Sequence, residues 1–302
     1  MTLIFVVLRR VLLGLISSVK GLLTNTAVFS VDFILTVYNL ITPDRPVGAV
    51  VPKGHPGYGG KWPEYTPPQE GDSRCSCPMM NAMSNHGILP RDGKNITFRE
   101  LDRAVRRTFN FAPTFCFFVP MYIGGLLGRP YATGRFDLAD IDAHNCIEHD
   151  ASLTRVDSFH DADQGRIAAP LVEEVLRSGT GPGGDLTRAD LSRLLGKRRV
   201  EAKRANPKYS STFTHKMFGA SNGSTLLTIF GGRVDDLRAV LLEERIPDGW
   251  EPRVRHRMGL TMAEFNLTVL PVELGIREEV DGSIAQAGIE RYAATGGSEK
   301  HA

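Results

Sequence analysis

The chain has 302 residues, of which 42% are hydrophobic and 23% are charged, and its formal net charge is +2. This composition is typical of a globular protein with enough chain for one large or two ordinary domains. A charge so close to zero gives no reason to expect nucleic acid as a partner, and four cysteines are too few for a disulfide scaffold.

The first 42 residues are more apolar than the rest of the chain. Arg9 and Arg10 separate two apolar runs, and Asp32 interrupts a third at 27–41. No run reaches the ~20 uninterrupted apolar residues of a spanning helix, so we predict short apolar helices that form an interfacial or re-entrant membrane anchor over 1–42. Docking of this segment on the domain core and a cleaved signal peptide are the alternatives.

Composition divides the remainder into three parts. Residues 43–71 are rich in proline, glycine and aromatic residues, which favours an extended connector. Residues 72–279 have the helical patterns of a folded domain. Residues 280–302 are rich in glycine, serine and alanine and are predicted to form a flexible C-terminal tail.

The body of the chain is a succession of helical patterns with no alternating strand pattern longer than four residues. The patterns cover 112–127, 167–176, 187–204 and 234–245, and the first of them is a buried helix or two short ones broken near Pro120. Three helix starts carry a capping sequence, at Thr97 with Glu100, Thr187 with Asp190 and Thr261 with Glu264. We therefore predict an all-α domain.

Cys77 is followed directly by Pro78, a residue that is favoured in the first position of a helix. Cys77 would then be the N-cap residue, with the free amides of Met79 and Met80 near its sulfur. A helix N-terminus lowers the pKa of a thiol and favours the thiolate, which can act as a nucleophile, a redox centre or a soft metal ligand. A disulfide or zinc pair with Cys75 is the competing interpretation.

A second polar cluster lies at 148–152, where Glu148, His149, Asp150 and Ser152 follow one another. Glu148 and Ser152 are four residues apart and would share one face of a helical turn, where they could hold a hard cation. Asp150 could fix the tautomer of His149 and keep the ring basic. The competing interpretation is a solvated helix cap.

Together these stretches resemble the heme-thiolate peroxidases, the fungal chloroperoxidases and unspecific peroxygenases. The resemblance covers about 72–274 and rests on Cys77-Pro78, Asn81, His86-Gly87, Leu89-Pro90-Arg91-Asp92-Gly93, Asn95-Ile96-Thr97, the 148–152 cluster, and Glu244-Arg245-Ile246-Pro247 with Gly249-Trp250. The apolar N-terminus and the sequence Ser73-Arg74-Cys75-Ser76-Cys77-Pro78 are most similar to fungal members associated with secondary metabolism.

The resemblance implies a chloroperoxidase-like helical domain around one heme b, with Cys77 as the axial iron ligand, although Ser76 replaces the first proline of the family's Pro-Cys-Pro motif. It also implies a divalent cation, Mg²⁺ or Mn²⁺, beside a heme propionate. Its ligands would be the side chains of Glu148 and Ser152 and the carbonyl of His149. The His149 ring would line the distal pocket, held by Asp150.

The distal side departs from the family pattern. The family has a glutamate about seventy residues beyond the Glu-His-Asp motif, and Asn222 occupies that position here. An amide can orient peroxide or substrate but cannot shuttle a proton, so His149 is predicted to be the acid/base and Asn222 an orienting residue. Asn222-Gly223-Ser224 is also a glycosylation sequon, and a glycan there would contradict this alignment.

The expected activity is oxidation of a hydrophobic small molecule by hydrogen peroxide, with a fungal secondary-metabolite intermediate as the substrate. We expect an enzyme associated with an endomembrane through its N-terminal segment, with secretion as the alternative. The alternative function is a heme protein of the same fold that has lost or altered peroxide activation and transforms a metabolite non-oxidatively. A non-heme thiol or metal protein is a third option.

Overall fold

The computed structural model describes residues 2–278, with side chains from Val19 onward. The elements in chain order are α1 (Thr2–Ile41), η1 (Tyr58–Gly60), α2 (Pro78–Asn85), β1 (Ile96–Thr97), α3 (Phe98–Phe109), α4 (Pro113–Leu126), β2 (Arg135–Phe136), η2 (Leu138–Asp142), α5 (Ala169–Arg177), η3 (Pro182–Gly184), α6 (Arg188–Ala205), α7 (Phe213–Thr228), α8 (Val234–Leu242) and α9 (Met262–Gly275). Within 2–278 the only sheet is the antiparallel pair β1–β2, which confirms the predicted all-α class.

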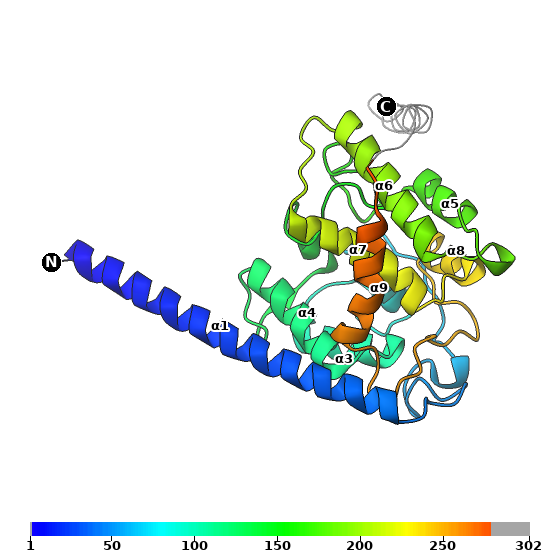
Figure 1. The fold of residues 1–302 in the computed structure, drawn as a ribbon, viewed down its shortest axis with the longest axis horizontal. Coiled ribbons are helices and arrows are strands. Elements are labelled where there is room, and N and C mark those ends of the chain that lie inside the picture. The colour runs from blue at the N-terminus through cyan, green and yellow to red at the C-terminus, as the bar shows by residue number, and fades with distance from the viewer. Residues whose placement is uncertain (1, 279–302) are drawn as a thin grey trace.

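The helices of the body pack in two groups that share one core (Figure 1). Helices α6, α7 and α9 pack on one another, while α3 packs on α4, and α8 contacts both α5 and α2. Apart from Arg155, the largest fully buried side chains are apolar, and they include Phe98, Phe109, Phe136, Phe230, Leu191, Leu194 and Leu237. This packing holds the start of the short helix α2 inside the body.

The three predicted capping sequences all form helix starts. The hydroxyls of Thr97, Thr187 and Thr261 accept hydrogen bonds from the amides of Glu100, Asp190 and Glu264, and each carboxylate returns a bond to its own cap residue. Such reciprocal bonds satisfy amides that have no partner inside the helix. Of the two alternatives predicted near Pro120, the structure has the single helix, because α4 continues through this proline.

The N-terminal segment differs from the prediction. Instead of short helices, Thr2–Ile41 forms one continuous helix of 40 residues. The charged and polar residues in this segment interrupt its hydropathy, but they do not interrupt helical backbone geometry, since arginine and lysine are good helix formers. The N-terminal half of α1 extends beyond the body (Figure 1).

The C-terminal half of α1 packs against α4 and α9 through buried polar side chains. Asp32 is 2% exposed, and its carboxylate accepts hydrogen bonds from the amides of Met262 and Ala263 at 3.1 and 3.0 Å and from the Thr114 hydroxyl at 2.5 Å. A carboxylate at the first amides of α9 is favoured by the positive end of that helix. Asn39 adds a bond to the carbonyl of Gly259 at 2.9 Å. These contacts make the end of α1 part of the body.

The opposite face of α1 is apolar and exposed. Its exposed side chains from Val19 to Ile41 include Leu22, Leu23, Phe33, Ile34, Val37 and Leu40. By length and composition, Val19–Ile41 is the one helical stretch among the described residues that could cross a membrane. Asp32 and Asn39 lie within it, so its inner face is bonded to protein.

Residues 43–71 follow the surface of the body without an α-helix. Trp62 anchors this stretch, because its indole nitrogen donates to the carbonyl of Trp250 at 2.9 Å. The division of the chain into an anchor, a connector, a domain and a tail, with boundaries after residues 42, 71 and 279, stays a prediction. The tail predicted at 280–302 lies outside the described residues.

Candidate active site

Cys77 is the N-cap residue of α2 and Pro78 is the first residue of the helix, as the dipeptide predicts. The backbone of Cys77 is extended (φ −88°, ψ 105°), as is typical of an N-cap residue. The amides of Met79 and Met80 lie near enough to its sulfur to lower the pKa of the thiol, but the side chain makes no capping hydrogen bond. Cys77 is a free, half-buried thiol, whereas Cys75 is fully buried.

The pKa of the Cys77 thiol is nevertheless raised above its ordinary value. Burial is the largest cause, and it outweighs the amides of Met80 and Met79 and the positive charge of Arg155, which lower the pKa. The helix end alone therefore does not hold a thiolate in this setting, contrary to the expectation from sequence. A metal ion that coordinates the sulfur would deprotonate it outright.

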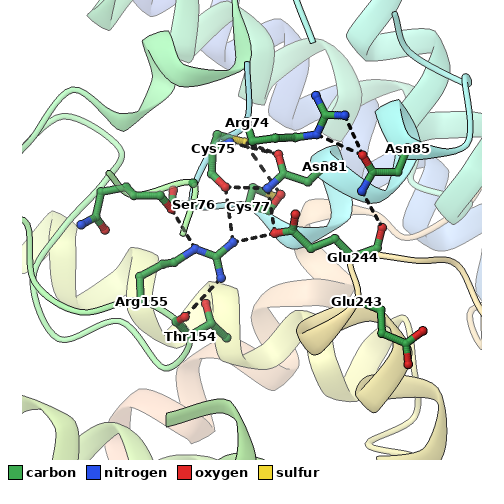
Figure 2. Close-up of polar contacts among 12 residues, drawn as sticks. Arg74, Cys75, Ser76, Cys77, Asn81, Asn85, Thr154, Arg155, Glu243 and Glu244 are labelled. Carbon is green, nitrogen blue, oxygen red and sulfur yellow. Dashed lines mark hydrogen bonds and ion pairs between the residues drawn. The ribbon is translucent and has the colours of Figure 1, made fainter. Parts of the chain in front are cut away.

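A buried polar network holds the loop that carries Cys77 (Figure 2). The Arg155 guanidinium forms an ion pair with Glu244 at 2.7 Å, with side chains 1% and 6% exposed. Asn81 donates to Glu244 at 2.8 Å and to the carbonyl of Cys75 at 2.7 Å, and Arg155 donates to the same carbonyl at 3.4 Å. Three segments that are distant in sequence, represented by Asn81, Arg155 and Glu244, thus meet at the loop that contains Cys75 and Cys77.

Two further contacts fix the same loop from its other side. Ser76 donates through its amide and hydroxyl to the carboxylate of Asp142, at 2.9 and 2.7 Å. A proline at this position would have neither donor, so the substitution has a structural use. Gly93 has φ +66°, and a Cβ there would lie 2.0 Å from the carbonyl oxygen of Ser73, so only glycine permits this approach.

The cluster at 148–152 is an irregular loop and not the helical turn that the spacing suggested. Ala151 has a left-handed backbone (φ +65°), which turns the chain between Asp150 and Ser152. Glu148 is buried, and one of its oxygens accepts from His144 Nδ1 at 2.6 Å, while the other oxygen has no partner. The Ser152 hydroxyl accepts from the amide of Thr154 at 3.3 Å.

This cluster gives only partial support for a cation site. The free oxygen of Glu148 is a suitable ligand for a hard cation. Among the described residues, no group of three or more histidine, cysteine, aspartate or glutamate side chains could hold a metal ion. A cation here would therefore need backbone carbonyls, water or an external ligand to complete its coordination.

His149 is buried and its ring orientation is fixed by the backbone. Nδ1 lies 2.8 Å from the carbonyl oxygen of Asp150, so Nδ1 carries the proton and donates it in this bond. The carboxylate of Asp150 does not hold the ring as expected; it accepts from the amide of Ser210 at 2.9 Å. Burial lowers the pKa of His149, and the charges of His215 and Arg199 act in the same direction. The neutral form of the ring is thereby favoured, with the proton on Nδ1 and Nε2 unprotonated.

Asn222 lies on α7 with its side-chain amide next to this ring. Its Nδ2 is 3.5 Å from His149 Nε2, a long contact in which the amide is the donor. Gly219, one turn earlier on α7, leaves room for the ring, since a Cβ there would lie 3.3 Å from His149 Cε1. The chain thus brings His149 and Asn222 together across 73 residues of sequence.

Sequence reasoning missed the residues that position these groups. Arg155, Asp142 and His144 had no signal of their own, because their partners Glu244, Ser76 and Glu148 could be recognised only in three dimensions. Arg155 also connects the two motifs. It lies three residues beyond Ser152 in sequence and contacts the Cys75 carbonyl.

Comparison with known proteins is consistent with this geometry. Residues 63–255 match the family described as peroxidase, family 2. An aromatic peroxygenase of Coprinellus radians is 28% identical over 165 residues, which cover 49% of this chain and 62% of the relative. A chloroperoxidase of Leptoxyphium fumago is 31% identical over 129 residues, 37% of this chain and 34% of the relative.

A dothistromin biosynthesis peroxidase of Dothistroma septosporum is 25% identical over 127 residues, which cover 37% of this chain and 30% of that protein. The chain thus matches less than two thirds of the length of each of these relatives. The family match extends over more than half of the chain and includes Cys77, the 148–152 cluster and Glu244. The resemblance inferred from the motifs is confirmed: the chain belongs to peroxidase family 2.

Proposed function

We propose that this protein is a heme-thiolate peroxidase or peroxygenase that uses hydrogen peroxide to oxidise a hydrophobic small molecule. The observation that carries the proposal is the half-buried Cys77 thiol at the N-terminus of α2, which has the amides of Met79 and Met80 nearby and lies in a loop braced by a buried polar network. The relatives named above are peroxygenases and peroxidases, which supports the same class.

Cys77 is the residue that would hold the iron of a heme b. Of the two thiols in the Cys75–Cys77 loop, only that of Cys77 is partly exposed, because Cys75 is fully buried against Asn81. A bound heme with a thiolate ligand supplies electron density that favours cleavage of the O–O bond of peroxide. The Arg155–Glu244 pair would keep the sulfur at a fixed position during this chemistry.

His149 would move the proton that peroxide cleavage requires. Heterolysis needs a base that takes a proton from one peroxide oxygen and returns it to the other. The ring is neutral, and its Nδ1–H is committed to the Asp150 carbonyl, so Nε2 is available to accept. Asn222 would orient the ring or the peroxide through its amide, which cannot itself carry a proton at useful pKa.

A divalent cation, Mg²⁺ or Mn²⁺, would use the unpartnered oxygen of Glu148. The Ser152 hydroxyl and the carbonyl of His149 are the other protein ligands that we propose, with water and a heme propionate to complete the shell. Metal analysis of the purified protein tests this. About one Mg²⁺ or Mn²⁺ per chain is expected in the wild type, and loss of that metal in Glu148→Gln at unchanged heme content.

We expect the protein to be associated with an endomembrane. Secretion is the alternative. The exposed apolar face of α1 supports association, whereas the bonds of Asp32 and Asn39 to the body are incompatible with a helix surrounded by lipid on all sides. We therefore infer that the C-terminal half of α1 lies along the membrane surface. An intermediate of fungal secondary metabolism is the substrate class we propose, by similarity to the dothistromin peroxidase.

The test is spectroscopic and kinetic. In the reduced carbon monoxide complex, a strongly red-shifted Soret band reports thiolate ligation, and it should be lost in Cys77→Ala and kept in Cys75→Ala. Peroxide turnover should fall by about 10²–10⁴-fold in His149→Ala, the usual contribution of general acid–base catalysis, and less in Asn222→Ala.

Two results would separate the competing functions. Full heme occupancy without peroxide turnover would support the heme protein that has lost peroxide activation. A colourless preparation would support the non-heme thiol or metal protein. Reversed effects of the His149 and Asn222 substitutions would exchange their proposed roles.

A further inference from the structure

A strongly basic cavity lies at the C-terminal end of α1, in the part of the body where the chain leaves that helix. Its volume is about 350 Å³. Five cationic side chains line it, together with His55: Arg45, Lys53, Arg106, Arg107 and Arg257. No acidic residue is part of the lining, and neither Cys77 nor His149 belongs to it.

The positive charge of this basic pocket is not compensated. Among the residues that the structure describes, none of the five cations forms an ion pair, whereas Arg129, Arg155 and Arg238 elsewhere are paired with carboxylates. Burial and the neighbouring charges of Arg257 and Arg106 lower the pKa of Arg45. Cations held together without counter-ions repel one another, so an anion in the pocket would be stabilised by all of them.

One donor in the pocket is already buried without a partner. The Nε of Arg45 has no hydrogen-bond acceptor, although the same guanidinium donates from its terminal nitrogen to the carbonyl of Arg257 at 2.8 Å. A buried donor without a partner destabilises the folded protein, and more so if it is charged. Guanidinium groups bind phosphate through two parallel hydrogen bonds, so several arginines at one cavity favour a phosphate ligand.

Exposed apolar side chains lie close in sequence to the pocket residue Arg45. Leu40 and Ile41 at the end of α1 are 77% and 75% exposed, and Val47, two residues beyond Arg45, is 80% exposed. A basic pocket beside exposed apolar residues matches the boundary of a membrane, where phosphate groups lie next to acyl chains.

We propose that the basic pocket binds the phosphate-bearing headgroup of an anionic lipid and so fixes the body against the membrane surface. This inference rests on the membrane association of α1 proposed above, but not on the peroxidase activity. A soluble phosphate compound has the same chemistry, and the experiment therefore separates the two sources.

The test uses the full-length heme-loaded protein in two measurements. The first is flotation with phosphatidylcholine vesicles, with and without phosphatidylinositol 4-phosphate. The second is calorimetric titration with inositol 1,4-bisphosphate, in nonionic detergent so that α1 does not contribute. The variant Arg106→Gln/Arg107→Gln removes two pocket charges. Its matched control, Arg99→Gln/Arg103→Gln, removes two exposed charges from the same helix, α3.

Wild type and the Arg99/Arg103 control should partition more strongly onto the phosphoinositide vesicles than onto phosphatidylcholine alone. The Arg106/Arg107 variant should lose about thirty-fold of this preference, because each basic residue near an anionic surface contributes about five- to sixfold. Binding of inositol bisphosphate should be weakened in the same variant only.

Equal partition onto both kinds of vesicle with no binding of inositol bisphosphate would overturn the proposal. Equal losses in the pocket variant and its control would do the same, because they would show general attraction to charge. Tight binding of inositol bisphosphate without any vesicle preference would retain the phosphate site and reject the lipid as its source. Each result is independent of peroxide turnover.

Discussion

Replacing Arg155 with methionine would test whether the buried network behind Cys77 positions the sulfur. Arg155 is 1% exposed, and it bonds to Glu244 and to the carbonyls of Gln164 and Thr154 at 2.8 and 3.1 Å. Methionine has a similar length and keeps the packing, but it leaves the Glu244 carboxylate buried beside Asn81 alone. The substitution therefore removes charge and donors, with little change in volume.

The expected cost follows from this burial. Removing one partner of a buried ion pair costs about 3–5 kcal/mol, because the other charge remains without compensation. The total free energy of unfolding of a domain is about 5–15 kcal/mol, so the variant should fold with reduced stability. For a domain of this size, about 4 kcal/mol corresponds to a decrease of roughly 8–16 °C in Tm.

The control is Arg199→Met, which breaks another buried pair. Arg199 bonds to both oxygens of Glu273 at 2.9 and 2.7 Å, with side chains 6% and 18% exposed, and it joins α6 to α9 away from the Cys77 loop. Thermal unfolding and the Soret band of the reduced carbon monoxide complex are measured for both variants. Both should lose stability, but only Arg155→Met should lose part of the red-shifted band.

The reasoning would be refuted by either of two outcomes. A Tm within about 2 °C of wild type for Arg155→Met would show that Glu244 is not left as a buried uncompensated charge, since each kcal/mol corresponds to about 2–4 °C. Equal loss of the red-shifted band in both variants would show that the effect is general destabilisation and not positioning of the sulfur.

Three further predictions concern stability. Asp32→Ala should cost about 1–3 kcal/mol in urea unfolding, because the first amides of α9 lose a buried acceptor, and a change below 0.5 kcal/mol would contradict this. Thr187→Ala should cost about 1 kcal/mol by loss of the α6 cap, whereas Thr187→Ser should be nearly neutral. The ion pair with Glu264 raises the pKa of His256, so its stabilisation should be complete below the unfolded pKa and lost as pH rises through the folded pKa. The stability difference between wild type and His256→Gln should therefore decrease as the pH rises above the ordinary histidine pKa of about 6.5; a constant difference would reject the linkage.

Local sequence patterns predicted those parts of the fold that depend on neighbouring residues. Cys77 lies at the helix N-cap because Pro78 can occupy the next position, and the threonine-based capping sequences begin helices because each contains both partners within four residues. The alignment that placed Asn222 beside His149 also agrees with the observed contact, although that contact does not test the catalytic roles.

The missed features depend on distant parts of the chain. In the sequence, Asp32 only interrupts an apolar segment. In the fold its carboxylate accepts a hydrogen bond from an amide at the start of α9, some 230 residues later. Adjacency suggested that the Asp150 carboxylate holds His149, but the turn at Ala151 sends that carboxylate to Ser210 and leaves the carbonyl for the ring. The ion pair of Arg155 with Glu244 likewise joins residues 89 positions apart.

The position of Asp32 has a practical consequence for anyone who wishes to shorten the protein. An apolar N-terminal helix is commonly removed to obtain a form that is easier to purify, and a boundary at residue 42 would be the obvious choice from hydropathy. Here that deletion would remove Asp32, Thr36 and Asn39, and with them the acceptor at the start of α9 and a donor to the Gly259 carbonyl. A truncation that ends before Val28, the first buried side chain of α1 within 19–41, retains all of these contacts while it removes the exposed residues Val19, Leu22 and Leu23.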